Sequence, residues 1–266
     1  MPLRHAVVLG LLHGPAELAP VSSSGHTTLL AWQRGWRYDE LDAAARKRVE
    51  VALHAGTAAA LLIAGRRELS ARHAGVVVLA CVPPAIAGKL LQGPIERRLG
   101  TPPTIAVGLL GGGGVMAIAE RLGGRERTRA DAGTLDGVAL GAAQTLALIP
   151  GVSRSGATRA TARWRGFSPL EADALSSAVG LPITLGAVAL KGHEALRSDR
   201  SEWPALGAGA LAAFSSTLVT GAVMRRAGGG RSLLPYAAYR VAVAAAVVRR
   251  LRQNASDDRR LRRRRR

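Results

Sequence analysis

The chain has 266 residues, of which 48% are hydrophobic, yet it carries a formal net charge of +19. These values fit a soluble basic protein that binds nucleic acid, or a membrane protein whose charge lies in its loops. The charge gathers in short stretches between long uncharged segments, and the few aromatic residues offer no stacking platform for nucleic acid. A lone cysteine, Cys81, excludes an intrachain disulfide and a cysteine-based metal cluster. The sequence therefore favours an integral membrane protein without a nucleic-acid partner.

The first segment is short and apolar and leads directly into a polar stretch. Residues 18–26 read LAPVSSSGH, and Glu17 stands just before them. Pro20 is expected to interrupt a helix, because proline lacks the amide donor and clashes with the preceding turn. A cleaved signal peptide fits poorly, because the apolar run at 6–12 is short and ends at this polar motif.

Further along the chain, six segments approach the roughly 20 residues that a membrane-spanning helix needs. In chain order they are residues 49–65, 74–91, 104–119, 170–190, 203–224 and the shorter 233–248. Alanine and glycine dominate these segments, and small residues allow membrane helices to approach closely. The segments are apolar nearly all round, which disfavours a soluble helical bundle. The sequence predicts an all-α polytopic membrane protein.

Loop charge predicts the side of the membrane that each connection faces. The basic loops 66–72, 121–129 and 225–231 are expected in the cytoplasm, and the mixed loops 33–48, 93–103 and 191–202 outside. Residues 134–167 then start and end on the cytoplasmic side, so they should enter the membrane and turn back. By the same count the N-terminal hairpin enters from the outer side.

The C-terminal tail, residues 249–266, conflicts with this assignment. It holds ten arginines against two aspartates. A single span after residue 231 places this charge outside, although positive charge usually stays in the cytoplasm. Such a charge run is expected to be disordered.

Two parts of the chain match at a spacing of 131 residues. Val21-Ser22-x-Ser24-Gly25 corresponds to Val152-Ser153-x-Ser155-Gly156, Thr27 to Thr158, and Glu40-x-Asp42-Ala43 to Glu171-x-Asp173-Ala174. The match predicts an inverted-topology repeat with two re-entrant helix-loop-helix hairpins, an architecture that places binding sites at the repeat interface. We expect one membrane domain over residues 1–248, with repeat one at about 1–119 and repeat two at about 132–248.

Both hairpins carry groups suited to an anion. Pro150 interrupts the second hairpin as Pro20 interrupts the first, and the serines and glycines that follow allow turns with exposed N–H groups. Helices that resume after these turns add positive dipole ends. Arg154 is costly inside a membrane unless it meets an anion, and its guanidinium suits phosphate oxygens. The residues expected to bind phosphate are Ser22, Ser24, Gly25, Ser153, Ser155, Gly156 and Thr158.

Glu17, Ser23 and His26 add a candidate base, nucleophile and proton carrier. A divalent cation held partly by Glu17 would neutralise charge on a phosphoanhydride. Structural alternatives stay open: the serines could cap a helix, His26 could be a satisfied interfacial residue, and Arg154 could pair with Glu17. His13 and His54 are interpreted as packing or polar-network residues rather than ligands.

The motifs HGPAELAPVSSSGH at 13–26 and PGVSRSGAT at 150–158 resemble the two signature motifs of the bacterial undecaprenyl-diphosphatase family, also called the bacitracin-resistance protein family. The likeness continues at 49–62, 181–187 and 233–248, and thus covers nearly all of the chain except the tail. It implies a membrane hydrolase that removes the terminal phosphate of undecaprenyl diphosphate. The reaction would take place at the outer side of the bacterial plasma membrane and would supply the carrier lipid for cell-wall synthesis.

The resemblance also assigns roles to residues. The family's acid corresponds to Glu17, its serines to Ser22 and Ser23, its histidine to His26 and its arginine to Arg154. The implied cofactor is Mg²⁺ or Ca²⁺, held by Glu17, with His13 as a further candidate. His13 stands where the family usually has Glu or Gln, which puts the metal preference in doubt.

Several alternatives remain at this stage. The nucleophile could be Ser23, which we favour, or His26, or an activated water. The rival function is a polyprenyl-phosphate translocase, because inverted repeats are common in transporters. The expected partners are a polyprenyl diphosphate lipid and membrane lipids, and the chain could form a homodimer.

Overall fold

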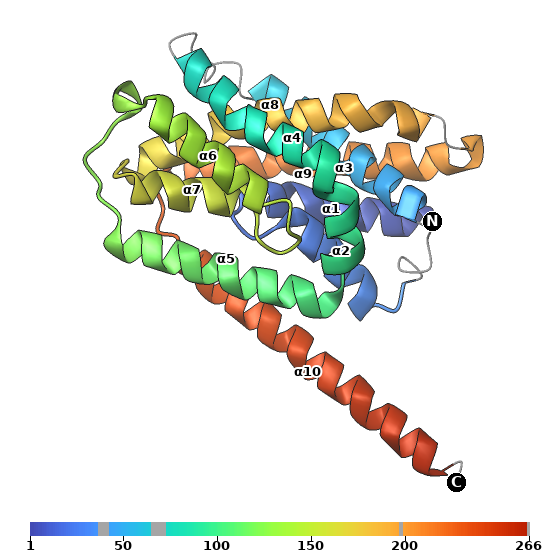
Figure 1. Ribbon diagram of the computed structural model, residues 1–266. Coiled ribbons are helices and arrows are strands. Elements are labelled where there is room, and N and C mark those ends of the chain that lie inside the picture. The colour runs from blue at the N-terminus through green and yellow to red at the C-terminus, as the bar shows by residue number, and fades with distance from the viewer. Residues whose placement is uncertain (37–42, 65–72, 197–198, 265–266) are drawn as a thin grey trace.

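The computed structural model describes residues 1–36, 43–64, 73–196 and 199–264. Over these ranges the protein is built from α-helices, and its sole β-type pairing is an isolated bridge between Arg127 and Phe167. The helices are α1 (Leu3–Leu18), α2 (Ser23–Gln33), α3 (Ala43–Ala64), α4 (Ala74–Leu99), α5 (Pro102–Leu122), α6 (Thr134–Leu146), α7 (Arg154–Trp164), α8 (Pro169–Leu196), α9 (Trp203–Arg226) and α10 (Leu234–Arg264). Figure 1 shows them gathered in one body from which the end of α10 projects.

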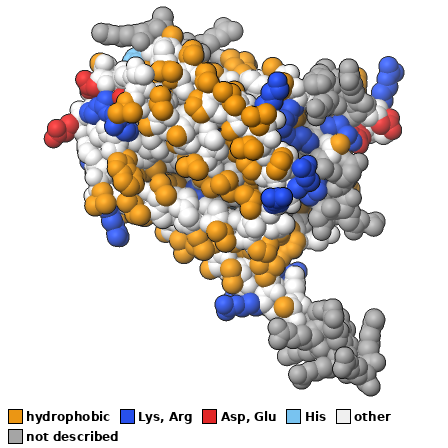
Figure 2. Space-filling model, in the orientation of Figure 1, with side chains coloured by type: hydrophobic (Ala, Val, Ile, Leu, Met, Phe, Trp, Pro, Cys, Tyr) orange, Lys and Arg blue, Asp and Glu red, His pale blue; other side chains and the backbone are white. Residues whose placement is uncertain are grey.

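Four segments are long and apolar enough to cross a membrane. They are Ala74–Ile95, Pro102–Leu122, Pro169–Gly192 and Arg200–Arg226, which belong to α4, α5, α8 and α9. Large hydrophobic side chains such as Val107 and Leu211 are about two-thirds exposed, at 69% and 66%. Figure 2 shows hydrophobic side chains spread over the body of the molecule. Exposed apolar surface of this kind requires a lipid environment. The protein is an all-α polytopic membrane protein, as the sequence predicted.

Two pairs of short helices, α1–α2 and α6–α7, form the hairpins that carry the polar motifs. These helices have 16, 11, 13 and 11 residues, fewer than the roughly 20 that cross a bilayer. Ser22 and Ser153 precede α2 and α7 with positive φ angles of 80° and 71°. The Oγ atom of Ser22 accepts a hydrogen bond from the Gly25 N–H, and that of Ser153 accepts one from the Gly156 N–H. The two motifs therefore build the same turn.

Helix packing follows the repeat. The first helix of each half packs against the fourth helix of the other half, α1 against α9 and α6 against α4. The third helices, α3 and α8, pack together, as do the fifth helices, α5 and α10. Figure 1 shows α6 beside α4, and α10 starting next to α5 before it diverges from the body. Two halves related by a two-fold axis are expected to form such reciprocal helix contacts. The contacts therefore support the inverted repeat.

Glycines allow the first helices of the two halves to pack this closely. A Cβ atom on Gly10 of α1 would clash with the Gly209 carbonyl oxygen of α9. A Cβ atom on Gly141 of α6 would lie 3.0 Å from the Leu79 carbonyl oxygen of α4. Gly10 and Gly141 stand at the same spacing as the motifs, so the repeat extends into the packing surfaces.

The expectation of a disordered tail needs correction, because α10 continues to Arg264. Residues 236–264 contain no glycine or proline to end the helix, and Arg, Leu and Gln are good helix formers. A helix that is already nucleated in the apolar part of α10 extends at little cost through such residues. Glu40 and Asp42 of the second matched block lie outside the described residues.

Candidate active site

Glu17, near the end of α1, joins the two hairpins. Its Oε1 atom accepts a hydrogen bond from Arg154 Nη2 at 2.7 Å, and its Oε2 atom accepts one from Ser23 Oγ at 2.6 Å. The Glu17 side chain is 9% exposed and that of Arg154 is 20% exposed. The predicted acid, hydroxyl and guanidinium thus meet in one place, and the ion pair that the sequence left as an alternative is present.

The hairpin turns also bind each other directly. The Gly151 N–H donates to Ser22 Oγ at 3.2 Å. Ser155 Oγ donates to the Ala19 carbonyl oxygen at 3.3 Å. Two chain breaks that lie 130 residues apart in sequence therefore satisfy one another's backbone groups, as a low-dielectric environment requires.

Further predicted phosphate-binding residues, Thr158, Gly25 and Gly156, support the turns, and so does Thr27, the counterpart of Thr158 in the first hairpin. Thr158 Oγ1 donates to the Arg154 carbonyl oxygen at 2.9 Å, and Thr27 Oγ1 donates to the Ser23 carbonyl oxygen at 3.1 Å and to that of Ser24 at 3.0 Å. The N–H groups of Gly25 and Gly156 are held by the capping serines. Helix capping, the structural alternative for the serines, accounts for Ser22 and Ser153.

His26 forms its hydrogen bonds with Ser22 and Tyr239. Its Nδ1 donates to the Ser22 carbonyl oxygen at 2.8 Å, and its Nε2 lies 2.9 Å from the Tyr239 hydroxyl of α10. The two rings stack with their centroids 5.5 Å apart. Both ring nitrogens therefore have partners in the hairpin and α10, and a catalytic role for His26 stays a prediction.

Arg240 of α10 is a site residue that the sequence interpretation missed. It is fully buried and donates to the carbonyl oxygens of Pro20 at 3.1 Å and Gly151 at 2.6 Å, one in each hairpin turn. Further bonds reach the carbonyl oxygens of Leu109 and Val152. An arginine inside the apolar segment 233–248 was the available signal, because intramembrane charges mark functional regions.

Replacement of Arg240 by methionine is expected to lower the melting temperature in detergent by about 5 °C or more, because several buried carbonyl groups lose their donor. Scanning fluorimetry of the purified protein measures this shift. Arg249→Met, at an exposed position of the same helix, is the matched control. Equal melting temperatures for the two variants would contradict the role of Arg240 in holding the two hairpin turns together.

A cavity of about 380 Å³ extends from the Glu17–Arg154 pair. Ser155 lines it near the ion pair, whereas Leu170, Leu181 and Met224 supply apolar lining. The cavity continues to the loop between α9 and α10, where Gly228 and Arg231 line it. Charged side chains also line it away from the ion pair, among them Arg159, Asp173 and Arg225. A lining that combines charged and apolar side chains suits an amphiphile with a charged head group.

Gly180 of α8 makes room for the guanidinium. A Cβ atom at this position would clash with Arg154 Nη1. The residue is a second one that sequence interpretation missed, and no local pattern marks it, since many glycines lie in apolar helices.

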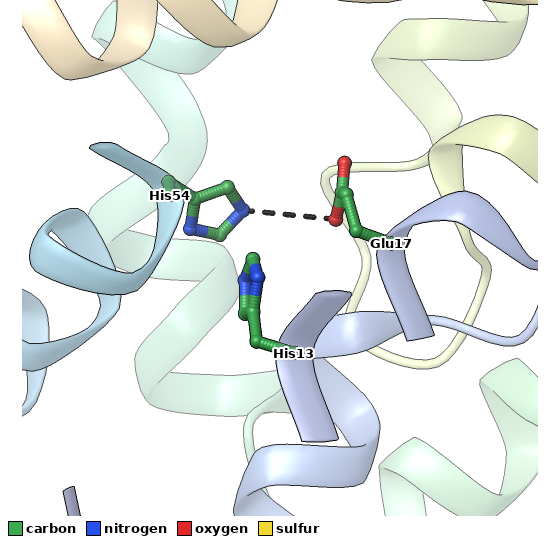
Figure 3. Close-up of side chains that lie close together, drawn as sticks. All are labelled: His13, Glu17 and His54. Atoms are coloured by element: carbon green, nitrogen blue, oxygen red, sulfur yellow. Dashed lines mark ion pairs between the residues drawn. The ribbon is translucent and has the colours of Figure 1, made fainter. Parts of the chain in front are cut away.

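His13, Glu17 and His54 form a cluster of possible metal ligands, with one donor atom of each within 4.8 Å of the others. Figure 3 shows both imidazoles turned toward the Glu17 carboxylate. Mg²⁺ and Ca²⁺ prefer oxygen donors, whereas this cluster offers two nitrogens and one carboxylate. The donor set therefore does not suit the expected ions. His13 and His54 belong to polar networks, as the sequence predicts, through hydrogen bonds to Thr57 and to the Glu50 carbonyl oxygen. They also converge on Glu17.

Together the fold and the site define an all-α polytopic membrane protein that holds an acid, a hydroxyl and a guanidinium at the head of an amphipathic cavity. The chain belongs to the family described as bacitracin resistance protein BacA, which matches residues 6–246.

Relatives agree with this assignment. The chain is 36% identical over 263 residues to the undecaprenyl-diphosphatase of Geobacter sulfurreducens, which covers 91% of this chain and 95% of the relative. It is 34% identical over 260 residues to the undecaprenyl-diphosphatase of Geobacter metallireducens, covering 89% and 94%. The undecaprenyl-diphosphatase of Gemmatimonas aurantiaca is 32% identical over 260 residues, covering 91% and 95%.

Proposed function

We propose that this protein hydrolyses undecaprenyl diphosphate to undecaprenyl phosphate and inorganic phosphate, which regenerates the carrier lipid for cell-wall synthesis. The observation that carries the proposal is the Glu17 carboxylate, which binds Ser23 and Arg154 at once. The names of the relatives, all undecaprenyl-diphosphatase, support the same reaction.

The reaction begins with Ser23 as the nucleophile. Glu17 Oε2 takes the Ser23 proton as Oγ attacks the terminal phosphorus, and the bond from that phosphorus to the bridging oxygen breaks. Undecaprenyl phosphate leaves with the bridging oxygen. Water then attacks the phosphoserine and releases inorganic phosphate, with the proton returned to Ser23. The 2.6 Å hydrogen bond from Ser23 to Glu17 favours this route over attack by His26.

Arg154 stabilises the charge that develops on the transferred phosphoryl group, the main burden in phosphoryl transfer. Its pairing with Glu17 keeps the guanidinium in place before the substrate binds. The apolar part of the cavity receives the first isoprenoid units of the lipid. We assign no step to Mg²⁺ or Ca²⁺, because two of the three donors in the His13, Glu17 and His54 cluster are imidazole nitrogens.

We further propose that the site lies in the bacterial plasma membrane with its cavity open to the outer side and that the hairpins are re-entrant. The cavity reaches the loop that precedes α10. The arginine-rich tail lies at the other end of α10, a helix of 31 residues. Ten arginines favour the cytoplasm. With the tail inside, the cavity faces outward, and the loop-charge orientation deduced from the sequence is reversed.

Single-cysteine labelling tests this orientation. In a Cys81→Ser background, Ser232→Cys reports the cavity side and Ser256→Cys reports the tail. A membrane-impermeant maleimide added to intact cells is expected to label the first variant at once and the second after permeabilisation only. Ser201→Cys, between α8 and α9, should behave like Ser256→Cys. The opposite pattern would place the cavity in the cytoplasm.

Phosphate release by the purified protein tests the reaction itself. In detergent, an enzyme releases phosphate from a polyprenyl diphosphate without a sealed membrane. A translocase, the rival reading, needs two compartments and releases none. The relatives are named as diphosphatases and not as translocases. Absence of phosphate release from wild-type protein with any divalent cation would refute the proposed hydrolysis.

A further inference from the structure

The cluster of His13, His54 and Glu17 has an unpaired acceptor at its centre. His13 is 1% exposed, and its Nε2 atom has no hydrogen-bond partner among the described residues. An unsatisfied buried polar atom is costly and calls for a ligand. Figure 3 shows the three side chains directed toward a common space.

The tautomer of His13 follows from its hydrogen-bond chain. Thr217 donates its hydroxyl proton to the Ala213 carbonyl oxygen at 2.7 Å. Thr57 Oγ1, 3.2 Å from Thr217 Oγ1, must then donate to Thr217. With that proton used, His13 Nδ1 must donate to Thr57 Oγ1 at 3.0 Å. The Nε2 atom therefore carries a lone pair and no proton.

His54 is oriented in the same way. Its Nδ1 lies 2.8 Å from the Glu50 carbonyl oxygen, which only accepts, so Nδ1 carries the proton. Its Nε2 faces Glu17 Oε2 at 4.0 Å. Ligating histidines characteristically donate the other ring N–H to a carbonyl or hydroxyl oxygen, which fixes the ring and its tautomer.

We propose that His13 Nε2, His54 Nε2 and Glu17 bind a divalent transition-metal cation of the zinc class. Two imidazole nitrogens and one carboxylate suit Zn²⁺ and Co²⁺ rather than the oxygen-seeking Mg²⁺ and Ca²⁺. Three protein ligands leave a fourth position open, which is the pattern of catalytic zinc sites. The cluster shares Glu17 with the reaction site, so this inference builds on the proposed function.

The geometry permits such a site after a small movement. Tetrahedral zinc, at about 2 Å from each ligand, needs donor atoms about 3.3 Å apart. The three donor atoms lie within 4.8 Å of one another, so a shift of about 1 Å closes the site. A carboxylate oxygen has two lone pairs, so Glu17 Oε2 can bind a cation while it accepts the Ser23 hydrogen bond.

Metal content and spectroscopy test the proposal without relying on activity. Purified wild-type protein incubated with Zn²⁺ is expected to retain about one ion per chain after gel filtration, and Co²⁺ should give the visible bands of a four-coordinate nitrogen and oxygen site. His13→Gln and His54→Gln should each weaken Zn²⁺ binding by about 100-fold or more. His5→Gln and His73→Gln, at histidines outside the cluster, are matched controls and should bind like the wild type.

Two further variants test the chemistry. Thr57→Val keeps all three ligands but removes the acceptor for His13 Nδ1, so it should weaken Zn²⁺ binding by about tenfold. His13→Glu replaces a nitrogen donor by oxygen and should shift the preference toward Mg²⁺ or Ca²⁺. Wild-type protein without bound Zn²⁺, or binding that survives loss of both histidines, would overturn the proposal. Because binding is measured apart from turnover, a protein that binds Zn²⁺ yet releases no phosphate would refute the reaction and leave the metal site standing.

Discussion

Arg154→Ala is expected to lower kcat/KM for a polyprenyl diphosphate by about a thousandfold, because the guanidinium stabilises charge that develops in the transition state. Arg154→Lys should recover only part of this loss, since an ammonium keeps the charge but not the paired donors. Phosphate release by the purified variants measures both effects.

Arg165→Ala is the matched control for this substitution. Arg165 follows α7, the helix that begins with Arg154, and pairs with Asp136 away from the site. It should keep wild-type turnover. If Arg154 only neutralised Glu17, its loss would lower the melting temperature and leave kcat nearly unchanged. Turnover by Arg154→Ala within tenfold of the wild type would therefore contradict the proposed role.

Glu17→Gln should reduce kcat by about a thousandfold, because the amide keeps the shape of the side chain but cannot take the Ser23 proton. Ser23→Ala should cause a similar loss. The double variant should be no worse than either single variant, since both residues act in one step. Steady-state phosphate release measures all three.

Glu171→Gln is the control for loss of a carboxylate, because Glu171 pairs with Arg129 outside the site. Its turnover should match the wild type. Losses in Glu17→Gln and Ser23→Ala that multiply in the double variant would show that the two residues act independently, against the shared proton transfer.

Much of the fold follows from local properties of the chain. Apolar length predicts the helices α4, α5, α8 and α9, and Pro20 and Pro150 mark the breaks between paired short helices. The spacing that matches Ser22 with Ser153 also predicts that the two turns are built alike, and they are. These features depend on hydropathy, proline and glycine, which act within a few residues. The tail departs from the prediction because α10 extends through good helix formers.

Sequence alone determined the membrane class and the helices, and it predicted the repeat and the residue types of the site. Tertiary structure decided which of those residues meet. Glu17 could have paired with several cations, and packing of the two hairpins selects Arg154, 137 residues away. Arg240 binds the carbonyl groups of both hairpin turns, and His13 lies with His54 beside Glu17. No local sequence pattern predicts either set of contacts. Contacts between distant segments depend on how whole helices pack, and short-range sequence patterns do not encode that arrangement.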